Sequence, residues 1–207
     1  NGTVTAAGTG VITLGDSDTG VTIGGTSTIG GASTGTITMG AIALNNNLTL
    51  GAGAATPVSL TTVTGPSSGT SDLTFNTTGS ITVSGAIGTN VGTLTITNSG
   101  GATFSSTVGA TTVTLTNTTG TIAFNGALTA TTLNTAAQAY NVALNASTGT
   151  ITNAVTFSNT GTVTLGTSGG TLAFTGGVVA TAPSAVTVNG TVTAAGTGVI
   201  TLGDSDT

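Results

Sequence analysis

Aspartate is the only charged residue in the chain, which holds five of them and no Lys, Arg, His, Glu or Cys. Asp16 and Asp18 lie in GDSDTG (15–20), and the same pair returns at 204 and 206. Two carboxylates separated by one residue and followed by Gly are typical of a turn that binds calcium, an ion with about six to eight oxygen ligands. Asp16 and Asp18 are therefore a candidate calcium site, and the alternative is a polar turn that keeps its loop soluble. For Asp72, in GTSDLTF (69–75), we predict a turn residue that bonds its own backbone.

Catalysis lacks its usual partners in this sequence. Ser is plentiful, but no His, Lys or Cys is present to activate it as a nucleophile. Hydrolysis by paired carboxylates requires that one carboxyl group has a higher pKa than the other. No neighbour of Asp16 or Asp18 in the sequence would raise the pKa of either one. We therefore expect no enzyme, no catalytic residue and, calcium apart, no cofactor.

The composition also argues against several partners. Nucleic acids and anionic membranes are bound through Lys and Arg, and the chain has neither. No apolar run approaches the roughly 18 residues of a membrane helix. We therefore expect no nucleic-acid partner and no membrane insertion by this region.

The residue types that surround the aspartates and make up most of the chain favour β-strands. Val, Ile and Thr are abundant and suit a pleated, half-buried surface. The long polar side chains that favour helices are almost absent. The sequence therefore predicts an all-β fold.

A short internal repeat specifies which all-β fold it is. Leu73, Leu94 and Val113 open successive segments in which apolar residues alternate with Thr, and Val83, Phe104 and Phe124 follow at the same spacing. A repeat of about 20–21 residues with period-two alternation is typical of a solenoid with one coil per repeat. Three apolar runs per coil predict three walls, and the two columns just named should point inward.

Asn and Gly separate the apolar runs and predict the corners of the coil. Asn76, Asn98 and Asn117 recur at the coil spacing, so we expect their side-chain amides to stack as a ladder. Two stretches run long and contain Pro, which cannot donate to a strand ladder. These stretches, 51–72 and 176–185, are predicted to be loops that bulge from the wall.

A second repeat is far longer. NGTVTAAGTGVITLGDSDT occupies residues 1–19 and returns unchanged at 189–207. We interpret 1–188 as one full solenoid unit of about nine coils and 189–207 as the start of the next identical unit. On that interpretation the two copies occupy equivalent coils, and neighbouring copies of the repeat associate end to end and side by side.

The strand repeats also carry a family resemblance. GTIAFNGALTATTLNT (120–135) and GTVTLGTSGGTLAFTGG (161–177) resemble the β-strand repeats of giant bacterial surface proteins, including filamentous-haemagglutinin-like adhesins and autotransporter passengers. The resemblance covers nearly the whole chain. It implies a right-handed parallel β-helix that is secreted and displayed at the cell surface.

Three functions are therefore open. The leading hypothesis is a structural extracellular rod for a surface filament, sheath or stalk. The alternative is an adhesin that binds its target through the loops at 51–72 and 176–185. An ice-binding solenoid is a third, since Thr-x-Thr recurs, but only some coils carry the pair and an ice-binding face needs it in one column. The pairs begin at Thr36, Thr93, Thr112, Thr162 and Thr191.

Overall fold

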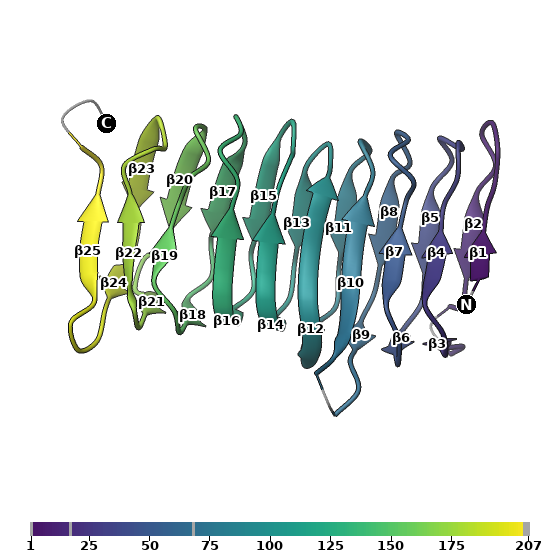
Figure 1. The fold of residues 1–207 in the computed structure, drawn as a ribbon, viewed down its shortest axis with the longest axis horizontal. Helices are drawn as coiled ribbons and strands as arrows, with labels where there is room; N and C mark the ends of the chain where they lie inside the picture. The colour runs from purple at the N-terminus through teal and green to yellow at the C-terminus, as the bar shows by residue number, and fades with distance from the viewer. Residues whose placement is uncertain (1, 17, 68, 205–207) are drawn as a thin grey trace.

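The computed structural model describes residues 2–16, 18–67 and 69–204, and this part of the chain is built from strands without a helix. The strands stack along one axis as a three-walled solenoid (Figure 1). Every strand pairing is parallel, which confirms the predicted all-β parallel β-helix. No helix that could cross a membrane occurs in the described residues.

The first wall faces the viewer in Figure 1. It consists of β1 (Gly2–Val4), β4 (Ser27–Ile29), β7 (Leu48–Leu50), β10 (Ser71–Asn76), the second halves of β12 (Ile87–Asn98), β14 (Val108–Leu115) and β16 (Leu128–Thr135), then β19 (Val155–Thr156), β22 (Gly177–Ala180) and β25 (Val199–Leu202).

The second wall is a single nine-stranded sheet. Its strands are β2 (Ile12–Leu14), β5 (Ile37–Met39), β8 (Val58–Leu60), β11 (Ile81–Val83), β13 (Ala102–Phe104), β15 (Thr121–Phe124), β17 (Asn141–Leu144), β20 (Thr162–Leu165) and β23 (Ala185–Val188).

The third wall shares three long strands with the first, because β12, β14 and β16 bend around the corner between them. It consists of β3 (Val21–Ile23), β6 (Ile42–Leu44), β9 (Val63–Thr64), the first halves of β12, β14 and β16, then β18 (Thr148–Ile151), β21 (Thr171–Phe174) and β24 (Thr191–Thr193).

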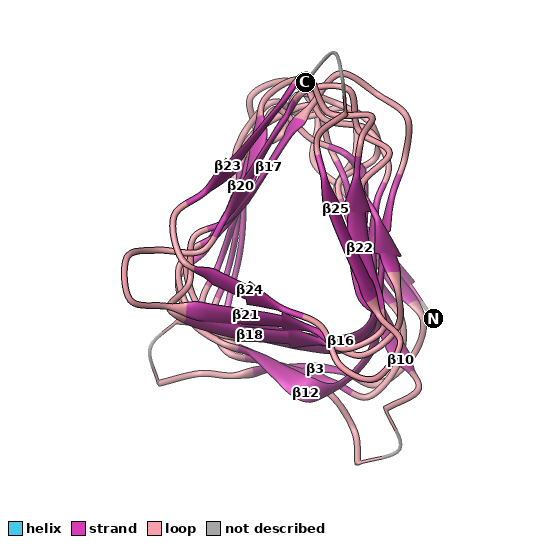
Figure 2. Ribbon diagram, turned by 90° about the vertical axis from the view of Figure 1, so that its left-hand side faces the viewer, coloured by secondary structure: helices cyan, strands magenta, loops and turns pink. Residues whose placement is uncertain are grey.

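The solenoid is right-handed, as Figure 2 shows from the C-terminal end. The chain follows the first wall in β22, crosses to the second in β23, and returns along the third in β24 before entering β25. It therefore runs anticlockwise while it advances toward the viewer.

The core is a set of inward columns whose members stack from coil to coil. Leu73, Leu94 and Val113 are partners in register, and each is 0% exposed. Val83 pairs with Phe104, and Phe104 pairs with Phe124 in the same way. The Phe104 and Phe124 rings stack with centroids 4.8 Å apart and planes 8° from parallel. Both predicted columns are confirmed.

Coil length is somewhat greater than the sequence repeat indicates, and it varies along the rod. Ile12 and Val186 stand in one column of the second wall, eight coils apart, so the average coil slightly exceeds the predicted repeat. The coil from Ile12 to Ile37 is the longest on this wall, and the coil from Ala102 to Ile122 is among the shortest.

The two predicted loops are loops only in part, because both stretches also contain wall strands. The stretch 51–72 contains β8, β9 and the start of β10, and 176–185 contains β22 and the first residue of β23. Pro57 and Pro183 each lie just before a strand, where a missing N–H removes no ladder bond. Within 51–72, the described residues between β9 and β10, 65–67 and 69–70, project from the solenoid (Figure 1).

The two copies of the nineteen-residue segment occupy different walls, so the expectation of equivalent coils is also wrong. Within the first copy, β1 lies on the first wall and β2 on the second. Within the second copy, β24 lies on the third wall and β25 on the first. From β1 to β24 the chain passes 26 wall segments, or eight and two-thirds coils, because the coils are longer than assumed. The division into units 1–188 and 189–207 stays a prediction.

A substitution in the stacked column tests this packing. Phe104→Ala should destabilise the protein by about 3–5 kcal/mol, because the ring is buried and the cavity cannot collapse between fixed coils. Thr103→Ala, the neighbour whose side chain points outward on the same strand, should stay within about 0.5 kcal/mol of wild type. Urea denaturation followed by circular dichroism measures both, and equal effects would contradict the inward column.

Candidate functional site

The Asp16 carboxylate is engaged by its own backbone. Its Oδ1 accepts the N–H of Asp18 at 2.9 Å and the N–H of Thr19 at 2.7 Å, and the Asp16 N–H donates to the Thr19 carbonyl at 3.1 Å. The amides of Asp18 and Thr19 hold the pKa of Asp16 below its usual value, because they bind the charged form. The Asp16 side chain therefore stabilises its own turn through hydrogen bonds to the backbone. A polar turn was the alternative to a calcium site in the sequence analysis.

The calcium site at Asp16 and Asp18 stays a prediction. Ser17 between them, and Asp206 in the second copy, lie outside the described residues. No cluster of three or more His, Cys, Asp or Glu side chains exists among the residues that the structure describes. Calcium bound there would therefore rely on Asp16, Asp18 and neutral oxygens for its ligands.

Asp72 links three coils, and the prediction that it bonds its own turn is wrong. It lies inside β10, at the corner between the third and first walls. Its N–H donates to Asn47 Oδ1 of the preceding coil at 3.0 Å, and its Oδ1 accepts the Thr93 N–H of the following coil at 2.8 Å. The carboxylate therefore completes the backbone ladder where the strand bends.

The predicted asparagine ladder is confirmed. Asn98 donates from Nδ2 to Asn76 Oδ1 at 3.0 Å, and Asn117 donates from Nδ2 to Asn98 Oδ1 at 3.0 Å. A further rung joins Asn145 Nδ2 to Asn125 Oδ1 at 3.1 Å, at the corner that follows the second wall. Each amide donates to one neighbour and can accept from the other, so a stack of identical residues satisfies itself.

A buried column of hydroxyl groups, which we did not predict, lines the corner between the first and second walls. Thr77 is 0% exposed; its Oγ1 donates to backbone carbonyls of the preceding coil, Ala54 and Thr56, and accepts the Gly79 N–H at 2.9 Å. In the next two coils, the Ser99 and Thr118 hydroxyls bond each other at 2.6 Å. Ser33 and Thr56 occupy the same corner in earlier coils. The available signal was a Ser or Thr directly after each ladder Asn, at 77, 99 and 118.

Larger polar side chains continue this corner. Tyr140 is buried, its hydroxyl donates to the Leu115 carbonyl at 2.9 Å, and it accepts the Ala136 N–H at 3.0 Å. Burial raises the pKa of Tyr140, because it disfavours the phenolate. In the next coil Asn159 donates from Nδ2 to the Tyr140 carbonyl at 3.0 Å. The corner therefore stays polar inside and closed to solvent.

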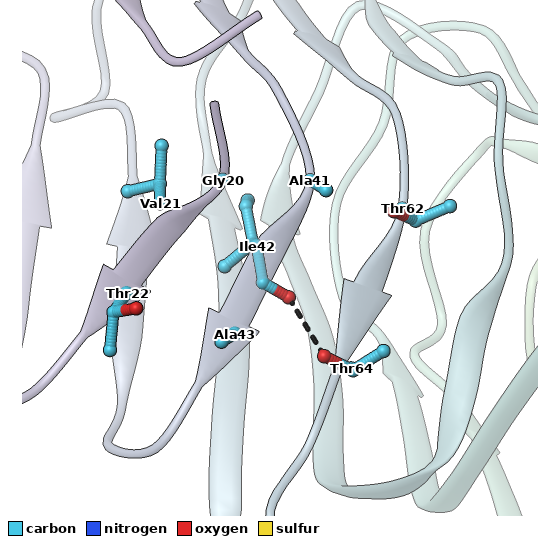
Figure 3. Close-up of a pocket in the computed structure, with 8 residues that line it drawn as sticks. All are labelled: Gly20, Val21, Thr22, Ala41, Ile42, Ala43, Thr62 and Thr64. Carbon is cyan, nitrogen blue, oxygen red and sulfur yellow. Dashed lines mark hydrogen bonds between the residues drawn. The ribbon is translucent and has the colours of Figure 1, made fainter. Parts of the chain in front are cut away.

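An open depression lies on the third wall (Figure 3). One hydrogen bond crosses it, from Thr64 Oγ1 to the Ile42 carbonyl at 3.2 Å. None of its side chains ionises, so it offers hydroxyl and backbone contacts without acid–base chemistry. It is lined by Gly20, Val21, Thr22, Ala41, Ile42, Ala43, Thr62 and Thr64.

Outward threonines form ordered columns, which the sequence did not make evident. On the first wall six successive coils place Thr in one register position, at residues 3, 28, 49, 74, 95 and 114. On the second wall Thr or Ser fills five successive positions, at residues 13, 38, 59, 82 and 103. The Thr-x-Thr pairs at 93/95 and 112/114 lie in register on adjacent coils. The wall surface is therefore a regular array of neutral hydroxyl groups.

Comparisons with protein families, with curated proteins and with solved structures found no match for this chain.

The buried hydroxyl column can be tested with a matched pair of substitutions. Thr77→Val keeps the side-chain shape but leaves two carbonyls and the Gly79 N–H without this partner, so it should cost about 1–3 kcal/mol of stability. Thr82→Val makes the same change on the exposed face of β11 and should cost less than about 0.5 kcal/mol. If urea denaturation finds the two variants equally stable, the corner hydroxyls do not stabilise the coil.

Proposed function

We propose that this protein is a structural rod that extends by end-to-end association of its solenoid, in an extracellular filament, sheath or stalk. One observation carries the proposal. Every large apolar side chain that is exposed among the described residues lies in the first or the last coil: Val4, Val11, Val188, Val199 and Ile200. Between them the walls present mostly Thr, Ser, Asn and Gly.

The backbone supports association at the same two ends. Among the described residues, β1, β2 and β3 each pair on one side, and so do β23, β24 and β25. Unpaired N–H and C=O groups along a strand edge are a template for a further strand. Burying the exposed apolar side chains at the same contact adds a favourable hydrophobic term.

The wall chemistry suits a durable extracellular material. With no Lys or Arg, the chain offers no cleavage site to trypsin-like proteases, and the ladders enclose its peptide bonds. Neutral hydroxyl walls carry little charge repulsion, which favours side-by-side packing of rods. The resemblance to repeats of bacterial surface proteins, the adhesin-like and autotransporter types, supports a position outside the cell.

A charge at the open end should block the rod. Val199→Lys places an ammonium among the exposed apolar side chains of β25, so filaments should shorten or disappear. Thr82→Lys adds the same charge in mid-wall and should leave filament length unchanged. Electron microscopy and sedimentation velocity measure length and mass, and wild-type protein that stays monomeric at every concentration would refute end-to-end association. Equal loss in both variants would point to contact through the walls instead.

The threonine columns favour ice binding as a second candidate function. The objection from the sequence was that the threonines would not share columns, and on the first wall six successive coils do share one. Parallel strands would space these hydroxyl and methyl groups regularly, at about 4.8 Å. Such a rigid, neutral array could order water at its surface.

Thermal hysteresis tests this second function. If the first wall binds ice, wild-type protein should depress the freezing point below the melting point, and Thr95→Lys, in mid-column, should abolish most of that gap. Thr175→Lys, at an exposed position outside the column, should preserve it. Absence of hysteresis in the wild type would exclude the second function.

A further inference from the structure

The described residues of the nineteen-residue segment have matching backbone geometry in both places where it occurs. Gly8 and Gly196 have φ of 63° and 57°, and Gly15 and Gly203 have φ of 69° and 76°. The same backbone bond closes the turn, from Gly10 N–H to the Ala7 carbonyl at 3.0 Å and from Gly198 N–H to the Ala195 carbonyl at 2.9 Å. Residues 2–15 and 190–203 therefore form the same strand–turn–strand module on different walls.

The two copies use opposite edges of this module. In the first copy, β1 and β2 pair with the strands that follow, β4 and β5. In the second copy, β24 and β25 pair with the strands that precede, β21 and β22. The edge that the second copy leaves open is the edge through which the first copy binds β4 and β5.

We infer that the segment is a joint, in which β24 and β25 of one chain take the place of β1 and β2 on a second copy of the chain. The inference rests on the proposed rod and specifies how its units meet. It requires no new pairing at β4 and β5, because Thr201 would meet Thr38 of the second copy as Thr13 meets Thr38 within one chain. The Gly198 carbonyl would likewise replace that of Gly10, which accepts the Ser33 hydroxyl at 2.5 Å.

The joint sets each unit one wall out of phase with the unit before. Since β1 lies on the first wall and β24 on the third, the second copy's first wall continues the first copy's third wall. Each unit then advances the rod by about 42 Å, and the same wall returns in line only after three units, at about 125 Å. A feature such as the projecting residues 65–67 and 69–70 would appear on the three sides of the rod in turn.

Disulfide trapping distinguishes this joint from simple stacking, because the natural chain has no cysteine. Thr3, Thr38 and Thr201 are all exposed. We would refold tagged Thr201→Cys protein together with Thr38→Cys protein, and separately with Thr3→Cys protein, and measure mixed disulfides by mass spectrometry. In the proposed joint Thr201 lies beside Thr38 of the second copy, so the first mixture should give at least a tenfold higher yield. In-phase stacking would instead place β25 against β1 and favour the second mixture.

The outcomes separate the joint from the rod itself. A mixed disulfide dominated by the Thr201→Cys and Thr3→Cys pair overturns the joint and keeps the rod. Filaments without either disulfide also overturn the joint. Neither disulfide and no filaments would refute the rod and the joint together.

Discussion

The structure depends on one constraint: each coil hydrogen-bonds only to the coils before and after it, so every position must accept a near copy of itself about 4.8 Å away. Apolar side chains meet this requirement by packing, as Phe104 does on Phe124. Amides meet it by donating one way and accepting the other, as Asn98 does between Asn76 and Asn117. A repeated charge cannot meet it, because like charges at that spacing repel. A chain with five aspartates and no basic residue is consistent with the constraint.

At the corners, polar side chains form hydrogen bonds with the buried backbone groups. A coil that bends three times must direct backbone carbonyls and amides into its own interior. Ser and Thr hydroxyls satisfy them from the inside at one corner. At another, Asp72 joins three coils, because its N–H donates to Asn47 and its carboxylate accepts the N–H of Thr93. The carboxylates of Asp16 and Asp72 therefore accept backbone N–H groups, Asp16 within its own turn and Asp72 from the following coil. What the surface retains is a neutral array of hydroxyl groups, with apolar side chains exposed at the two ends.

The sequence predicted the features that repeat locally. The inward columns and the asparagine ladder follow from residue spacing, because stacking requires similar residues one coil apart. The prediction that the two copies of the nineteen-residue segment occupy equivalent coils failed, because it depends on the number of coils between them. Coils of unequal length make the long repeat span eight and two-thirds coils. Pro57 and Pro183 were weak evidence for long loops, because a proline before a strand leaves the ladder intact. Asp72 was misassigned because its partners, Asn47 and Thr93, belong to the neighbouring coils and are distant in the sequence.

The central claim is that successive coils stack in register, and methyl–methyl nuclear Overhauser effects test it most directly. With threonine methyl groups labelled, the account predicts cross-peaks between Thr74 and Thr95 and between Thr95 and Thr114, which are register partners about 5 Å apart. It predicts none between Thr74 and Thr114, two coils and about 10 Å apart. Absence of the first two cross-peaks, or a cross-peak that joins Thr95 to a strand outside its two neighbouring coils, would contradict the solenoid.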